Sequence, residues 1–118
     1  FRPVNESGDR LAIISNGGGP AVLATDALTS HGGRLAVLSP ETTARLNGVL
    51  PPTWSHANPV DIIGDAQGER YGQALQAVLE AEEADAVMVM KCPTAVSDNL
   101  EAAEVVVQTY HAHELALG

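Results

Sequence analysis

The sequence has little of the residue types on which several classes of protein depend. Cys92 is the only cysteine among 118 residues, so no disulfide can form within the chain and a cytoplasmic location is expected. Aromatic residues make up only 3% of the chain, which argues against an aromatic surface on which nucleic-acid bases stack. Neither a run of about 18 apolar residues nor a Lys/Arg-led apolar leader is present, so we expect no membrane span.

Positive charge is also scarce. Lys and Arg number 6 against 15 Asp and Glu, which gives a formal net charge of -9. This balance argues against nucleic acid or an anionic membrane as a partner, because nothing offsets the repulsion between like charges. A local phosphate site remains open, since backbone N–H groups can supply positive potential without a lysine.

Length and composition together indicate one folded domain. Hydrophobic residues make up 45% of the chain and charged residues 18%, so the chain can bury a core. A length of 118 residues suits a single core. We therefore interpret residues 1–118 as one domain, and because the chain begins with Phe1 rather than Met, we expect it to be excised from a larger protein.

Short apolar runs and helical patterns alternate along the chain. Short, mainly apolar runs predict four strands, at 11–14, 35–38, 60–63 and 86–90, and the continuous run at 11–14 is typical of a strand that is covered on both faces. Helices are predicted from Pro20 to His31, from Pro40 to Leu50 with Ser39 as N-cap, through Tyr71 to Leu79, and from Leu100 to Tyr110. The segments between them, including 51–59 and 91–99, are predicted loops.

This alternation predicts an α/β fold with a parallel sheet between two layers of helices. We interpret it as a flavodoxin-like, doubly wound, three-layer α/β/α domain. Such sheets usually have five strands, whereas the chain ends at Gly118, where a fifth would begin. The sheet would then lack its last strand, and its open edge makes a homodimer one partner to consider.

The most distinctive turn is Gly17-Gly18-Gly19, between the first predicted strand and the first predicted helix. In doubly wound sheets ligands lie at the carboxyl ends of the strands, which is where this turn falls. Glycines let backbone N–H groups approach a ligand closely, and the helix that follows presents its positive end. The turn is therefore a candidate anion site, although turns between strands and helices favour glycine for structural reasons as well.

Known nucleotide-binding patterns do not match this turn. A dinucleotide-binding fingerprint needs a third glycine where Val22 stands, and a phosphate-binding loop of the Walker type needs a Gly-Lys-Ser/Thr segment that the chain lacks. A phospho-receiver domain would carry an acidic pair where Ser15 and Asn16 stand.

Two further residues are candidates for the ligand-binding edge. Asp61, in the third predicted strand, is a candidate acceptor or ligand, or else caps a neighbouring loop. Lys91 is the only lysine and ends the fourth predicted strand, so it faces the same edge unless it is simply a solvated loop cation. The four histidines lack metal-ligand spacing, and no metal site is predicted.

Four stretches of the sequence look like parts of one known domain. They are RLAIISNGGGPAVLATDAL, GGRLAVLSPETTARLNGVLPPTWSHANPVDIIGDA, ERYGQALQAVL and DAVMVMKCPTA. Over residues 9–110 the chain resembles the ligase-type flavodoxin-like domain of the NDP-forming acyl-CoA synthetases, relatives of succinyl-CoA synthetase. It is most similar to long, multi-domain members that resemble acetate–CoA ligases, many of which end in a GNAT acetyltransferase domain.

The resemblance implies a share in an enzyme that interconverts acyl-CoA, nucleoside diphosphate and phosphate with free acid, CoA and nucleoside triphosphate. The route passes through an acyl phosphate and a phosphorylated histidine. CoA, ATP or ADP and Mg²⁺ would be bound by the full-length protein and not by this domain alone. The implied partners are its CoA-binding, phosphohistidine and ATP-grasp domains.

The resemblance also implies a role for the glycine turn. In the family this domain contributes a glycine-led helix N-terminus that stabilises the phosphohistidine, a role that falls here on Asn16, Gly17, Gly18, Gly19 and Pro20. The domain would not be catalytic alone. One alternative is a regulatory or scaffold domain of a GNAT-fused protein lysine acetyltransferase whose synthetase module is inactive, and another is an interaction module with no anion site.

Overall fold

The structure is a computed structural model, and it describes residues 2–3, 10–92 and 99–117. The elements follow one another as β1 (Arg2–Pro3), β2 (Arg10–Ser15), α1 (Gly18–Ser30), β3 (Arg34–Leu35), α2 (Pro40–Val49), β4 (Val60–Asp61), α3 (Gly68–Ala81), β5 (Ala86–Met90) and α4 (Asn99–Leu117). The strands predicted at 11–14 and 86–90 are confirmed. The part of the predicted loop at 93–98 lies outside the described residues.

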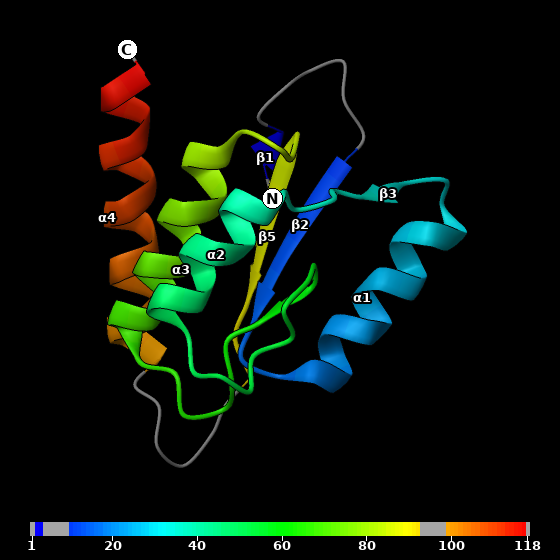
Figure 1. The fold of residues 1–118 in the computed structure, drawn as a ribbon, viewed down its shortest axis with the longest axis horizontal. Helices are drawn as coiled ribbons and strands as arrows, with labels where there is room; N and C mark the ends of the chain where they lie inside the picture. The colour runs from blue at the N-terminus through cyan, green and yellow to red at the C-terminus, as the bar shows by residue number, and fades with distance from the viewer. Residues whose placement is uncertain (1, 4–9, 93–98, 118) are drawn as a thin grey trace.

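The central strand of the sheet is β2, which is paired along both edges (Figure 1). On one edge it runs parallel to β5 through five residue pairs, from Leu11 with Ala86 to Ser15 with Met90. On its other edge β3 pairs with the first half of β2 and β4 with the second half, both parallel. The short β1 lies outside β5 and is antiparallel to it.

A parallel sheet flanked by helices confirms the predicted α/β class, while two details of the sheet differ from the prediction. The strands expected at 35–38 and 60–63 contain only two paired residues each, and they share one side of β2. The fifth strand is β1, at the beginning of the chain, and no strand follows α4 in the described part of the chain. A two-residue strand has no periodicity, so its pairing could not be read from the sequence.

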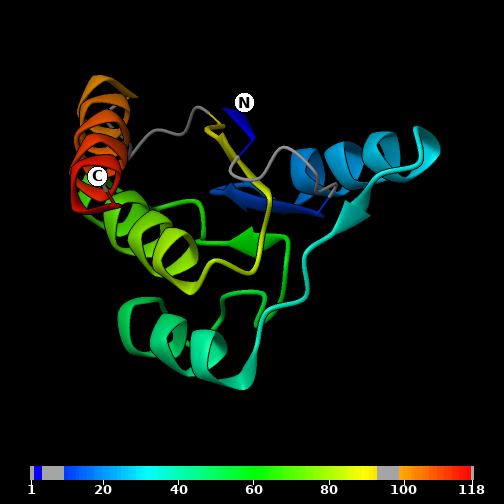
Figure 2. The same ribbon diagram turned by 90° about the horizontal axis from the view of Figure 1, so that it is seen from above.

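Helices cover the sheet on both faces (Figure 2). Alternate residues of β2 point to opposite sides, which is the two-residue period of a strand. Ala12 and Ile14 pack in the larger core with α2 and α3, whereas Leu11 and Ile13 pack in a smaller core with α1. α4 lies against α3 rather than on the face that α1 covers.

The two helices that follow β2 and β3 begin in different ways. α2 begins as predicted, with Pro40 at its first position and the Ser39 side chain accepting a hydrogen bond from the Thr42 N–H at 3.2 Å. α1 begins at Gly18, two residues earlier than predicted, with Gly17 as an N-cap that has no side chain. Pro20 is therefore the third residue of α1, where a missing N–H still costs no hydrogen bond.

The Asn58 side chain bridges the segments where β3 and β2 stop pairing. Its Oδ1 accepts from the Ile13 N–H at 2.9 Å, and its Nδ2 donates to the Leu11 and Ala36 carbonyls at 2.8 and 2.9 Å. One amide thereby replaces the ladder hydrogen bonds that a longer β3 would have made. The chain can therefore leave the sheet after β3 while the buried backbone N–H and carbonyl groups keep hydrogen-bond partners.

At the amino-terminal end of β2, the Arg10 side chain forms an ion pair with Asp85. The Arg10 guanidinium donates to both carboxylate oxygens at 2.9 and 3.1 Å, and the Arg10 N–H donates at 3.0 Å. These hydrogen bonds lower the pKa of the Asp85 carboxyl. They fix the register between β2 and β5, which determines how the other ends of these strands meet.

We expect the Arg10–Asp85 contact to make stability depend on acid. Because folding lowers the pKa of Asp85, its contribution is fully present above the unfolded pKa of about 3.9 and is lost as the pH falls further. Asp85→Asn should therefore lower the unfolding temperature at pH 7, and the difference from the parent should shrink below about pH 4. Thermal unfolding at both pH values tests this, with the exposed Asp26→Asn as a control for net charge. A difference that stays constant with pH would contradict it.

Candidate functional site

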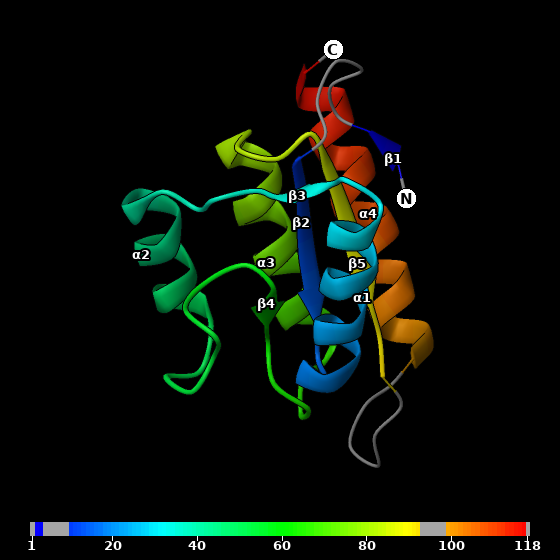
Figure 3. The ribbon, with the colours of Figure 1, turned by 90° about the vertical axis from the view of Figure 1, so that its right-hand side faces the viewer.

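The carboxyl ends of β2, β4 and β5 bring together residues from three parts of the sequence. Ser15, the last residue of β2, is paired with Asp61 on one side and with Met90 on the other. The glycine turn follows Ser15, and α1 begins at the same edge of the sheet (Figure 3). This is the position predicted for a ligand site in a doubly wound sheet.

The turn is held by hydrogen bonds from the two residues before it. The Ser15 hydroxyl accepts from the Gly17 N–H at 3.0 Å and donates to the Gly17 carbonyl at 2.9 Å. The Asn16 side chain accepts from the Cys92 N–H at 2.6 Å and donates to the Cys92 carbonyl at 2.8 Å. Ser15 and Asn16 are buried, so the turn is rigidly placed relative to the end of β5.

The three glycines have different surroundings. A Cβ at Gly17 would lie 2.7 Å from the Sγ of Cys92, which follows β5, so any side chain at position 17 would collide with Cys92. A Cβ at Gly18 would lie 3.2 Å from the Asp61 Oδ2, and one at Gly19 would meet no atom within 4 Å. Close packing thus explains Gly17, whereas nothing in the described residues requires a glycine at position 19. Gly18 and Gly19 are both exposed.

The opening of α1 presents backbone donors to solvent. The first N–H groups of a helix have no acceptor one turn earlier, and Gly17 offers no side chain to accept from them. The Gly17 N–H is bonded to Ser15, and Pro20 has no N–H. The donors that remain at this exposed helix end are those of Gly18 and Gly19, and the helix dipole adds positive potential.

Asp61 and Lys91 lie on opposite sides of the sheet edge. The Asp61 Oδ1 accepts from the Ile63 N–H at 2.9 Å, while its Oδ2 lies beside Gly18. Lys91 extends over the ring of Tyr71 on α3, with Nζ 5.9 Å from the ring centroid. The structure therefore brings Asp61, but not Lys91, to the glycine turn.

Two residues at this edge were not singled out from the sequence as site residues. Tyr71 donates from its hydroxyl to the Met90 carbonyl at 3.1 Å, and burial raises its pKa. Ser15 holds the turn, and the signal for it was its place directly before the turn, where serine often bonds the backbone two residues on. For Tyr71 the sequence shows only that it belongs to the apolar stripe of a helix, which does not predict the hydrogen bond from its hydroxyl to Met90.

The described residues offer no metal centre, since no three His, Cys, Asp or Glu side chains among them are placed to hold one ion. The two ring nitrogens of His56 form hydrogen bonds, one with the Asn47 side chain at 3.1 Å and one with the Pro52 carbonyl at 2.8 Å. Cys92 is partly buried against Gly17. No helix in the described ranges is long and apolar enough to cross a membrane.

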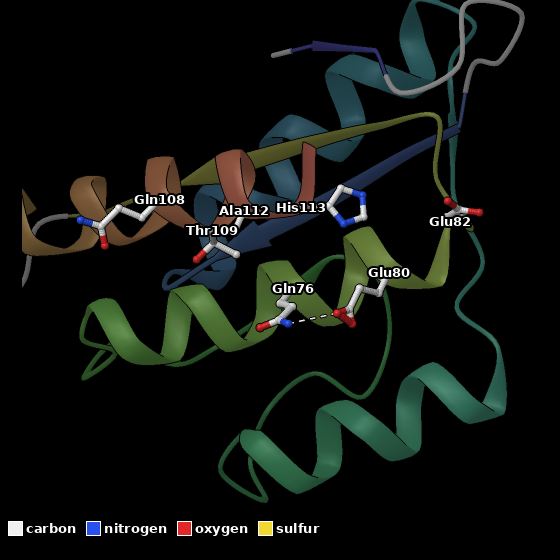
Figure 4. A pocket seen from close by; sticks show the side chains of 7 residues that line it. All are labelled: Gln76, Glu80, Glu82, Gln108, Thr109, Ala112 and His113. Atoms are coloured by element: carbon white, nitrogen blue, oxygen red, sulfur yellow. Dashed lines mark hydrogen bonds between the residues drawn. The ribbon is translucent and has the colours of Figure 1, made fainter. Parts of the chain in front are cut away.

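A groove of about 500 Å³ lies elsewhere, between α3 and α4 (Figure 4). It is lined by Gln76, Glu80, Glu82, Gln108, Thr109, Ala112 and His113. Glu80 accepts from the Gln76 amide at 3.0 Å and pairs with Arg45 at 2.9 Å, and these contacts lower its pKa. The groove contains none of the residues of the glycine turn, and its carboxylates make it unsuited to a phosphate.

Comparisons with known proteins agree with this architecture. Residues 11–115 match the family described as "Ligase-CoA domain". The chain is 46% identical over 97 residues to an ADP-forming acetate–CoA ligase I of Archaeoglobus fulgidus, covering 82% of this chain and 14% of that protein. It is 40% identical over 104 residues to the alpha subunit of the ADP-forming acetate–CoA ligase I of Pyrococcus furiosus, covering 88% and 22%.

A solved structure gives the same result at the level of the fold. The acetyl-coenzyme A synthetase 1 of Ca. Korarchaeum cryptofilum, described as dinucleotide forming and in complex with phosphate and ADP, superposes with a TM-score of 0.86 at 32% identity. The match covers 97% of this chain and 24% of that one. The chain thus spans less than a quarter of the length of each of these relatives. It belongs to the Ligase-CoA domain family.

Proposed function

We propose that the chain is one domain of an ADP-forming acyl-CoA synthetase and that the opening of α1 stabilises a phosphoryl group during transfer. The observation that carries this proposal is the pair of N–H donors of Gly18 and Gly19 at an exposed helix start where no side chain makes a capping hydrogen bond. The family membership supports it, because the relatives are named as ADP-forming ligases.

The geometry suits an anion that arrives from outside the chain. Two N–H donors and the helix dipole provide positive potential without an ammonium group, which fits an acidic chain. Ser15 and Asn16 hold the turn before any ligand arrives, so little reorganisation is needed when charge develops on the phosphoryl group. Within the site predicted from sequence, Asn16 and Gly17 therefore act by positioning, and Gly18 and Gly19 act as donors.

The phosphoryl group is carried by another domain in this proposal. The resemblance assigns the phosphorylated histidine to a neighbouring domain, so the anion reaches the opening of α1 from outside the chain. Val22 and Leu23 are 58% and 71% exposed on α1 close to its start, an apolar surface that suits contact with such a domain. CoA, ATP or ADP and Mg²⁺ would be bound by the full-length protein.

A titration with inorganic phosphate tests the anion site directly. We expect the amide resonances of Gly18 and Gly19 to shift in a saturable way at millimolar phosphate in ¹H–¹⁵N spectra of the chain. The Gly48 amide, in the exposed part of α2, should stay in place. Equal movement at all three glycines, or no movement at Gly18 and Gly19, would contradict the proposed site.

Asp61 should weaken phosphate binding at this site. Its free Oδ2 lies beside Gly18, so a bound anion would approach a like charge. A charge pair at about 4 Å costs about 1 kcal/mol even in water, so Asp61→Asn should tighten phosphate binding about fivefold. The control is Glu41→Gln, which removes an exposed carboxylate from the first turn of α2. Weaker binding by Asp61→Asn would show instead that the carboxylate helps to hold the ligand.

A further inference from the structure

Lys91 has an ammonium group that the described residues leave without a hydrogen-bond partner. Its Nζ is buried, and the contact found for it is the face of the Tyr71 ring, 5.9 Å from the centroid. A buried ammonium loses its hydration, and a single cation–π contact does not replace it. No ion pair joins it to Asp61 in the described part of the chain. Among the described residues, the face of the Tyr71 ring is therefore the contact found for this charge.

The groups around Lys91 are fixed in place. On one side the Met90 carbonyl accepts from the Tyr71 hydroxyl, and on the other the Cys92 backbone is bonded twice to Asn16. Lys91 itself is partly exposed, so rotation of its flexible side chain can bring the ammonium to an anion at the sheet edge. The backbone that carries it does not need to move.

We propose that Lys91 is a second anion-binding residue of this edge and that its ligand is an oxyanion of the phosphate type. The neighbouring Cys92 touches Gly17, whereas the Lys91 side chain lies over Tyr71 and must rotate around the end of β5 to reach an anion near the glycine turn. The identity of the anion rests on the proposed function. The inference that an anion binds here rests on the buried ammonium, which has no hydrogen-bond partner among the described residues.

The test uses Lys91→Met, which keeps the length of the side chain and removes the charge. Inorganic phosphate is titrated against the chain and followed by thermal unfolding and by the Gly18 and Gly19 amides. Without phosphate the variant should unfold at the same temperature as the parent or higher, because the buried ammonium that has no hydrogen-bond partner among the described residues is gone. With phosphate its affinity should fall at least about fivefold, and Lys91→Arg should retain most of it.

Arg45→Met is the matched control, since it removes an exposed cation from α2 and should leave phosphate affinity unchanged. Parental phosphate affinity in Lys91→Met would overturn the inference, and so would a lower unfolding temperature without phosphate, which would make Lys91 structural. In either case a saturable response of the Gly18 and Gly19 amides would leave the proposed function standing. Loss of that response in the parent chain, with a phosphate affinity that still depends on Lys91, would reject the proposed function and keep this inference.

Discussion

Under the proposed function, Gly19→Val is expected to reduce phosphoryl transfer by the full-length protein about 100-fold or more while the domain stays folded. The reason is the position of Gly19 at the exposed opening of α1, where its N–H is one of two donors proposed to face the phosphoryl group. A branched side chain there would cover the approach to both donors. Valine keeps the backbone N–H but blocks access to it, and the loss of one preorganised contact to a developing oxyanion typically costs about 100-fold or more.

Gly19 has space for a side chain, so a substitution there should leave the fold intact. A Cβ at this position meets no atom within 4 Å, so the variant should fold with little change in stability. Gly48→Val is the matched control, because Gly48 is also an exposed helical glycine whose Cβ would meet nothing within 4 Å. The effect is measured as ATP formation from an acyl-CoA, ADP and phosphate, together with labelling of the histidine that the proposed function assigns to a neighbouring domain. Equal rates in the two variants would reject the role assigned to the start of α1.

Asn58→Ala is expected to lower the free energy of unfolding by about 3 kcal/mol. Its amide makes three hydrogen bonds to buried backbone, to the Ile13 N–H and to the Leu11 and Ala36 carbonyls. In the variant the Leu11 carbonyl still accepts from the Ala36 N–H, whereas the Ile13 N–H loses Asn58 as its acceptor. A buried donor or acceptor left without a partner costs about 1–3 kcal/mol, which sets the scale of the loss.

Urea unfolding of the chain measures this loss, and Asn47→Ala provides the comparison. The Asn47 oxygen accepts from the Trp54 indole at 2.8 Å and lies 3.1 Å from a ring nitrogen of His56. Its removal leaves one buried donor, the Trp54 N–H, without this acceptor and should cost about 1–2 kcal/mol, less than the loss at Asn58. Asn58→Asp keeps the acceptor for Ile13 but sets a carboxylate against two carbonyls, and it should be at least as unstable as the alanine variant. Similar stability of Asn58→Ala and Asn47→Ala would contradict the bridging role.

Local patterns were enough to predict the elements whose signals are continuous along the chain. The apolar run at 86–90 became β5, the helical stripe through Tyr71 became α3, and Ser39-Pro40 began α2. These features depend on neighbours one strand period or one helical turn away, which the sequence displays directly. The position of the glycine turn at the end of β2 was predicted for the same reason.

The sequence by itself thus determined the alternation of strands and helices, the parallel sheet, the glycine turn at its carboxyl edge and the resemblance to the Ligase-CoA family. The tertiary structure decided that β3 and β4 share one side of β2, that Asn58 closes the gap between them, and that β1 joins the sheet at β5. It also placed the Asp61 carboxylate beside Gly18, and it placed the Lys91 ammonium against the Tyr71 ring of α3. These arrangements depend on contacts between residues far apart in the chain, and on which face each side chain takes at a strand end. No local period encodes them.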